Sequence, residues 1–118
     1  MAIAGPQVSR ILVVDDEVSL TPLFAKALER VGYDVAVAHS LWEAQQVPGP
    51  FDAIVADIRL PNGDGRDLRS LYPGIPFVVI SGFDADSVAA MTEPYFLPKP
   101  FNPPSLQAMV KKALEEHP

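Results

Sequence analysis

The stretch that decides the fold of this chain is Arg10-Ile-Leu-Val-Val-Asp-Asp16. Its unbroken apolar run is typical of a strand buried on both faces, and two acids follow where that strand ends. The pattern recurs twice, because Ala53-Ile-Val-Ala56 precedes Asp57 and Phe77-Val-Val-Ile80 precedes Ser81. In open parallel sheets, ligands bind outside the carboxyl ends of the strands. We therefore expect these polar side chains to gather at one sheet edge.

The rest of the chain alternates predicted strands with predicted helices. Strands are expected over residues 10–15, 33–38, 53–57, 77–81 and 95–98. Helices are expected over about 19–31, from a Ser40 cap to Pro48, from the turn at Gly65 to about 71, over about 85–91, and from an Asn102 cap to the C-terminus. Five strands alternating with five helices predict an α/β fold, with a parallel sheet covered on both faces.

The helix over 19–31 should bury one apolar stripe and end at Gly32, a residue suited to a helix C-terminus. The stripe comprises Leu20, Leu23, Phe24, Ala27, Leu28 and Val31. Trp42, in the short second helix, is expected to pack against the protein. The two histidines, His39 and His117, are interpreted as surface residues without a role.

Composition excludes several classes of protein. The 118 residues suit one domain, which we place at 10–118, with residues 1–9 as a tail or linker. The net charge of −6 disfavours a nucleic-acid partner, because phosphate binding needs clustered lysine and arginine. The chain has no cysteine, no apolar run approaching a membrane span and no recognisable export signal. We therefore predict a cytoplasmic protein without a membrane partner.

The three acids at the sheet edge indicate a cation site. Two carboxylates about 5 Å apart repel by roughly 3 kcal/mol at an effective dielectric constant near 20. Such a group among Asp15, Asp16 and Asp57 favours Mg²⁺ or Mn²⁺, which prefer oxygen ligands. Lys99 and Ser81 could then hold phosphoryl oxygens, and Asp57 is a plausible nucleophile, since a carboxylate can form an acyl phosphate.

The ordered set of motifs resembles the receiver domain of two-component response regulators, over about residues 10–116. The matching elements are Asp15-Asp16, the spacing of Asp57, Pro61 and Gly65, then Ser81, and Lys99-Pro100-Phe101. The resemblance implies a (βα)5, flavodoxin-like fold. It also implies phosphorelay signalling, in which a histidine kinase or a histidine phosphotransfer protein donates a phosphoryl group.

The same resemblance assigns roles to individual residues. Asp57 would be the phosphoacceptor, and Ser81 and Lys99 would grip the phosphoryl group. Ser81 and Phe96 would form the conformational switch. The Lys99-Pro100 peptide bond is expected to be cis.

A metal ligand set is also implied by the resemblance. Mg²⁺, or Mn²⁺ as the alternative, would be bound by Asp16, Asp57 and the backbone carbonyl of Arg59. Asp15 would assist through a water molecule.

The sequence departs from the usual receiver pattern in ways that are similar to receivers of hybrid histidine kinases. Arg59 stands two residues after the phosphoacceptor, the second, third and fourth helices are short, and Thr92-Glu93-Pro94 replaces the customary Gly-Ala. Residues 82–94 leave room for a fourth helix of only about 5–9 residues, after loops of the usual length. Because the fourth helix often contributes to receiver dimers, we predict a monomer or a weak dimer.

Two other functions stay open. A pseudo-receiver would keep the fold as an interaction module without phosphotransfer. A phosphatase with an aspartyl nucleophile would turn over an external phosphoester, but such enzymes usually carry a second acid where this chain has Arg59. We expect no turnover of an external substrate, so the protein is not predicted to be an enzyme.

Overall fold

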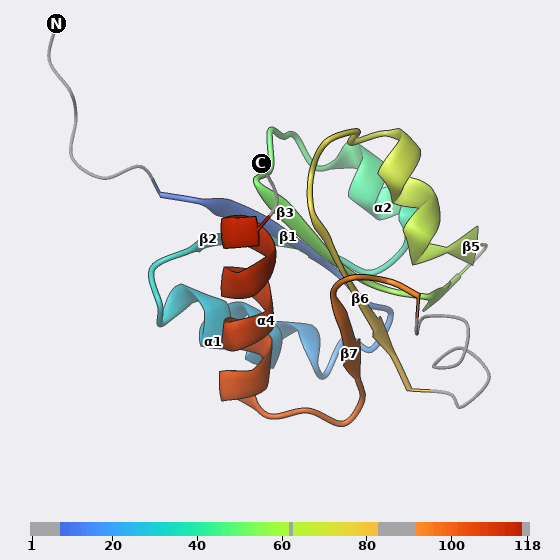
Figure 1. Cartoon of the computed structure of the whole chain (residues 1–118). Coiled ribbons are helices and arrows are strands. Elements are labelled where there is room, and N and C mark those ends of the chain that lie inside the picture. Colours follow the sequence, from blue (N-terminus) through green and yellow to red (C-terminus); the bar gives the residue numbers. More distant parts are fainter. Residues whose placement is uncertain (1–7, 62, 83–91, 117–118) are drawn as a thin grey trace, which may run out of the picture.

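The computed structural model, which describes residues 8–61, 63–82 and 92–116, contains a five-stranded parallel sheet (Figure 1). The strands are β1 (Arg10–Val14), β2 (Asp34–Ala38), β3 (Ala53–Asp57), β6 (Phe77–Ser81) and β7 (Phe96–Pro98). Their order is β2-β1-β3-β6-β7, and every neighbouring pair is parallel. The predicted α/β class is confirmed. The strands β2 and β7 begin one residue later than expected, and β1 ends one residue earlier.

Helices cover both faces of the sheet (Figure 1). On one face, α1 (Thr21–Glu29) and α4 (Pro103–Glu116) pack over a core that includes Ile11, Val55 and Leu106. On the other face, the six-residue α2 (Leu41–Gln46) and the 3₁₀ helix η1 (Gly65–Ser70) pack over a core that includes Leu12, Ile54 and Leu68. The β1 and β3 side chains alternate between these two cores, as the period of a strand requires.

Side-chain caps begin α2 and α4 where the sequence predicts. The backbone N–H of Glu43 donates to Ser40 Oγ at 3.0 Å, and the N–H of Ser105 donates to Asn102 Oδ1 at 2.9 Å. In a standard capping box, the Glu43 carboxylate would accept the backbone N–H of the cap residue, Ser40. Here it accepts the N–H of His39, one residue before the cap. Gly32 has φ of 100°, which suits the turn that leaves α1.

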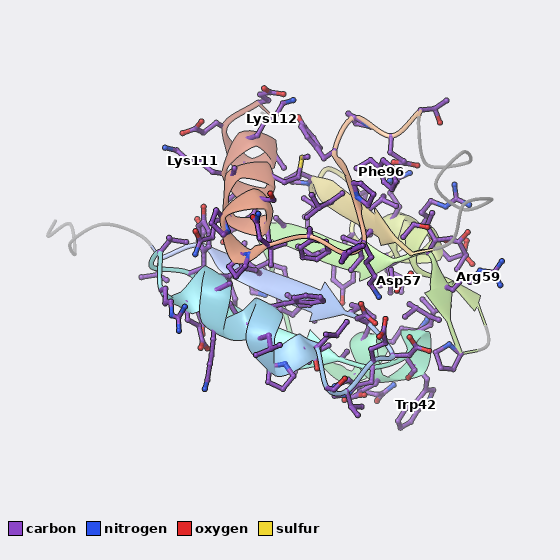
Figure 2. All side chains as sticks on the ribbon, turned by 90° about the horizontal axis from the view of Figure 1, so that it is seen from below. Trp42, Asp57, Arg59, Phe96, Lys111 and Lys112 are labelled. Carbon is purple, nitrogen blue, oxygen red and sulfur yellow. The ribbon has the colours of Figure 1, made fainter. Side chains whose placement is uncertain are left out.

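Three apolar side chains expected to pack are exposed instead. Trp42 is 71% exposed, Leu23 60% and Val31 51%. In α2, Leu41 takes the inward position against Gly63, so Trp42, one residue further around the helix, points outward (Figure 2). Leu23 and Val31 lie outside the stripe that α1 buries against the sheet and α4.

The shortened helices are confirmed in part. The second helix has six residues, and the third is a 3₁₀ helix. The predicted helix over 85–91 lies outside the described residues, as does His117. None of the helices in the described residues combines the length and the apolar character needed to cross a membrane.

A small hairpin after β3 was not predicted. Strands β4 (Arg59–Leu60) and β5 (Gly63–Asp64) pair antiparallel and lead directly into η1. An Asn-Gly pair between two strands can indicate a hairpin, but here Gly63 already belongs to β5 and pairs with Leu60. The sequence alone predicts this segment only as a turn before the third helix.

Candidate functional site

The parallel strands deliver the predicted residues to one edge of the sheet. Asp57 ends β3 and Ser81 ends β6, while Asp15 and Lys99 each follow the last residue of a strand. Asp57 is the register partner of Ile80, which places Ser81 one residue beyond it on the neighbouring strand. The N–H of Lys99 donates to the carbonyl of Ser81 at 2.8 Å, so β7 extends this edge.

Three carboxylates converge here as predicted. One oxygen from each of Asp15, Asp16 and Asp57 lies within 4.8 Å of the others. Asp15 is fully buried, Asp57 is 6% exposed and Asp16 is exposed, so the cluster is open on one side. Buried Asp15 Oδ2 accepts no hydrogen bond of ordinary geometry in the described part of the chain. A buried carboxylate oxygen without a hydrogen bond, in an all-oxygen donor set, fits Mg²⁺ or Mn²⁺.

Lys99 brings the counter-charge into the site. Its Nζ donates to Asp57 Oδ2 at 2.8 Å and to Glu17 Oε1 at 2.6 Å, and it lies 2.7 Å from Asp15 Oδ2 as an ion pair. The Lys99 side chain is only 12% exposed. Burial works to lower the pKa of Lys99, but the contacts with Asp15, Asp57 and Glu17 outweigh it and raise that pKa. The ammonium is therefore permanently charged.

Asp57 differs electrostatically from an ordinary surface carboxylate. Burial raises its pKa, and the hydrogen bond and charge of Lys99 and the N–H of Arg59 offset this only in part. The neighbouring charge of Asp15 adds to the upward shift of the pKa. An ionised Asp57 is thus held at a free-energy cost that a divalent cation would relieve.

The loop after β3 fixes the carboxylate of Asp57. The N–H of Arg59 donates to Asp57 Oδ1 at 3.0 Å, and the N–H of Gly65 donates to the carbonyl of Ile58 at 3.0 Å. A Cβ atom at Gly65 would lie 2.0 Å from the carbonyl oxygen of Asp57, so any side chain there would displace the backbone. This close approach explains why glycine stands eight residues after Asp57.

The remaining predicted residues lie around this centre. Phe96 is half-buried at the start of β7 and packs against Ile58 and Val79, so a core role is evident and switching stays a prediction. The Arg59 side chain is exposed at the rim (Figure 2), and its carbonyl as a metal ligand stays a prediction. The Lys99-Pro100 bond is cis as predicted, and Gly49-Pro50 is cis as well.

Two interactions were missed in the sequence. Glu17 contacts Lys99, and its position directly after Asp15-Asp16 could have suggested it. His39 is not an idle surface residue, because its Nε2 lies 3.0 Å from the hydroxyl of buried Thr21 and its Nδ1 lies 3.3 Å from Glu43 Oε1. His39 thereby links the start of α1 to α2, a contact between distant segments for which the sequence carries no local signal.

Comparison with known proteins identifies the family. The model of the response regulator receiver domain matches residues 11–111. The chain belongs to the response regulator receiver domain family. The receiver domain is 36% identical to the sensor kinase CckA of Brucella abortus over 90% of this chain, and 32% identical to the transcriptional regulatory protein ZraR of Escherichia coli K12 over 88%. It spans only 12% of that kinase and 26% of that regulator.

Solved structures agree with the fold of the receiver domain. A CheY-like response regulator receiver domain protein from Methanospirillum hungatei superimposes with a TM-score of 0.82 at 28% identity, covering 94% of this chain and 97% of the other. A response regulator receiver protein from Sinorhizobium medicae gives 0.80 at 30% identity, covering 95% and 98%. The predicted receiver family and its five-stranded parallel fold are therefore confirmed.

Proposed function

We propose that this receiver domain accepts a phosphoryl group on Asp57 in a Mg²⁺-dependent reaction. The observation that carries the proposal is the 2.8 Å hydrogen bond from Lys99 to Asp57 inside a cluster of three converging carboxylates. One buried carboxylate thus faces both a fixed ammonium and a cation site. That combination supplies what phosphoryl transfer to an aspartate needs, namely an oriented nucleophile and charge stabilisation.

The donor is a phosphohistidine on a histidine kinase or a phosphotransfer protein. A carboxylate oxygen of Asp57 bonds to phosphorus as the bond from phosphorus to the imidazole nitrogen breaks. That nitrogen keeps the electron pair and takes a proton from solvent. Lys99 donates a hydrogen bond to a transferring phosphoryl oxygen, and Ser81, at the end of β6, is assigned to another.

Asp16, Asp57 and Asp15 would hold the metal ion, with the Arg59 carbonyl as a further ligand. Bound there, Mg²⁺ neutralises part of the charge on the carboxylates and on the phosphoryl oxygens. Asp15 Oδ2 is buried and accepts no hydrogen bond in the described residues, although it lies in an ion pair with Lys99. This supports a closer role for Asp15 than the water-mediated one that we expect from the resemblance.

The two other candidate functions have less support. A pseudo-receiver has no need to keep Lys99 buried against Asp57 or to bear mutually repelling carboxylates. A phosphatase needs a general acid two residues beyond its nucleophile, where this chain has the exposed Arg59. We therefore propose a phosphoacceptor without turnover of an external substrate.

Donor docking is proposed beside Lys99. A hollow of about 400 Å³ lies between α1 and the segment after β7, and Leu20, Phe24 and Phe101 provide its apolar lining. Exposed Leu23 lies along a second, apolar hollow that shares these three residues. This surface suits an amphipathic helix that brings a phosphohistidine to Asp57.

We propose that the protein is cytoplasmic and that it is a monomer or a weak dimer. Light scattering with and without phosphorylation would check the oligomeric state.

Labelling by acetyl phosphate and Mg²⁺ tests the function. We expect one phosphoryl group per chain, stable in acid, labile in base and located on Asp57 by peptide mapping. Asp57→Asn should abolish it, while Asp34→Asn, the same change at the opposite sheet edge, should not. Label on Ser81, or undiminished labelling of Asp57→Asn, would contradict the proposal.

A further inference from the structure

We propose that Glu17 is a displaceable counter-ion of Lys99, which holds the ammonium in the unphosphorylated protein and gives up its place to the incoming phosphoryl oxygen. It would be a positioning residue that acts through Lys99. The inference rests on the proposed phosphoacceptor function. The Glu17 carboxylate would compete with the phosphoryl group for the Lys99 ammonium, and this competition would set how readily the site accepts a phosphoryl group.

The contacts of Lys99 leave little room for a further acceptor. Its Nζ donates hydrogen bonds to Asp57 and Glu17 and lies in an ion pair with Asp15 Oδ2, so three carboxylate oxygens surround the ammonium at 2.6–2.8 Å. Glu17 Oε1, at 2.6 Å, is the nearest of the three. With the Lys99 side chain only 12% exposed, the ammonium cannot turn toward solvent to find a new acceptor. We therefore expect a phosphoryl oxygen to bind Lys99 by taking the place of one carboxylate.

Glu17 is the carboxylate that can leave most easily. Asp57 carries the phosphoryl group and cannot move away from it. Asp15 is fully buried, and its Oδ1 accepts the backbone N–H of Glu17 at 2.9 Å, so its side chain is fixed. The Glu17 side chain is 51% exposed, and it lines the hollow beside Lys99 together with Gly82 and Pro100. It can swing into water without breaking packing.

The charge of Glu17 is also placed to oppose an anionic donor. Its carboxylate is half-exposed, contacts Lys99 and lines the hollow described above. A phosphoryl donor approaching Lys99 must therefore displace a negative group as well as bind a positive one. Glu17 could act through its contact with Lys99 or only through its negative charge. A shorter acidic side chain separates the two, because it loses the contact but keeps the charge. It should ease phosphorylation only if the contact matters.

Three variants of the full chain separate these effects. Glu17→Gln removes the charge and weakens the contact, and Glu17→Asp keeps the charge but is one methylene too short to hold Lys99. Glu29→Gln is the matched control, since Glu29 is an exposed acid at the far end of α1. Each would be assayed at saturating Mg²⁺ for the rate of labelling by acetyl phosphate and for the affinity of beryllium trifluoride, a phosphoryl analogue.

We expect Glu17→Gln and Glu17→Asp to raise both quantities by about two- to fivefold, the range expected for losing one partly exposed ion pair. Glu29→Gln should match the wild type. Wild-type values in both Glu17 variants would overturn the inference while leaving Asp57 labelling intact. A rise in Glu17→Gln alone would reduce the effect to charge repulsion and also overturn it.

A binding measurement without any phosphoryl group completes the test. Glu17 is not part of the converging carboxylate cluster, so calorimetry should give Mg²⁺ affinities for Glu17→Gln within about twofold of the wild type. A large loss of affinity would make Glu17 a metal ligand and would overturn its role as a counter-ion. If the wild type itself takes no label on Asp57, the proposed function fails, a result distinct from both of these.

Discussion

The sheet places a cation beside acidic side chains at both ends of its strands, but the exposure of these groups to solvent differs. We call the end where the parallel strands finish the carboxyl edge, and the end where they begin the amino edge. At the carboxyl edge, Lys99 is 12% exposed and contacts three carboxylates. At the amino edge, Arg10 is 31% exposed, lies 3.4 Å from Asp34, which is 65% exposed, and stacks its guanidinium over Phe51 at 4.7 Å. The residue types are nearly the same, so burial and convergence distinguish the functional edge from the structural one.

The difference between the edges is one of free energy. Solvent screens the ion pair at the amino edge. This pair therefore contributes little to stability, and its charges cost little because they stay solvated. At the carboxyl edge, Asp15, Asp57 and Lys99 are largely desolvated, so a change of charge at any of these three residues should have a large effect. Burial also raises the pKa of Asp57, which shows that this edge holds charge at a cost.

Lys99→Ala should produce the largest effect and would sharpen the contrast most. Removing the ammonium leaves Asp15 and Asp57 buried without a counter-charge, and breaking a buried ion pair in this way costs about 3–5 kcal/mol. We expect urea denaturation in a chelator to show a loss of that order. Because a divalent cation can replace the lost charge, Mg²⁺ should restore much of the stability.

A small loss for Lys99→Ala in the chelator would break the comparison, since the carboxyl edge would then behave like a screened surface. Arg10→Ala is the matched control at the amino edge. It should cost about 1 kcal/mol or less, and its effect should not depend on Mg²⁺.

Mg²⁺ itself should stabilise the wild-type protein through the carboxyl edge alone. At a concentration one hundred times its Kd, a ligand that binds only the folded state adds about 2.7 kcal/mol. Asp16→Asn removes an exposed member of the cluster and should shrink the rise in melting temperature. Asp34→Asn, the same change at the amino edge, should leave the rise intact. Equal rises in the wild type and Asp16→Asn would remove Asp16 from the ligand set.

Asp57→Asn should stabilise the metal-free protein at neutral pH. A carboxyl whose pKa is higher in the folded than in the unfolded state favours folding while protonated. That contribution is complete below the unfolded pKa and is lost as the pH rises through the folded pKa. Burial raises the pKa of Asp57, so ionised Asp57 opposes folding at pH 7.

Melting curves in a chelator check this sign. Asp57→Asn should melt a few degrees above the wild type at pH 7, and the gap should close below about pH 4, where both side chains are neutral. A variant less stable than the wild type at pH 7 would mean that the hydrogen bond with Lys99 outweighs burial.

The sequence predicts the carboxyl edge well because its information is local. Asp15, Asp57 and Ser81 each follow a short apolar run that is typical of a buried strand, and the parallel direction of the strands then brings them together. The register is fixed by burial, since a slip of one residue would turn Asp57 away from the edge. The signal for the cap at Asn102 is equally local, and the cap is confirmed.

The sequence fails where a contact depends on distant segments. Trp42 was expected to pack, but the neighbouring Leu41 occupies the inward position against Gly63, across the hairpin that we missed. The contact between Glu17 and Lys99 joins residues 82 positions apart, and no periodicity marks it. Short helices such as α2 carry too few residues for a stripe to show which side faces inward.

Asp34→Asn should have the smallest effect and tests the amino edge from the other side. The Asp34 carboxylate is 65% exposed and lies 3.4 Å from Arg10 Nε, so solvent and salt screen the attraction. After the substitution, the guanidinium of Arg10 still donates to the carbonyl of Pro48 and still lies over Phe51. The loss in urea denaturation should therefore be no more than about 0.5 kcal/mol, and it should vanish in high salt. A loss above about 1 kcal/mol that persists in high salt would show that the ion pair at the amino edge is also desolvated. The two edges would then differ only in the number of carboxylates that converge on one cation.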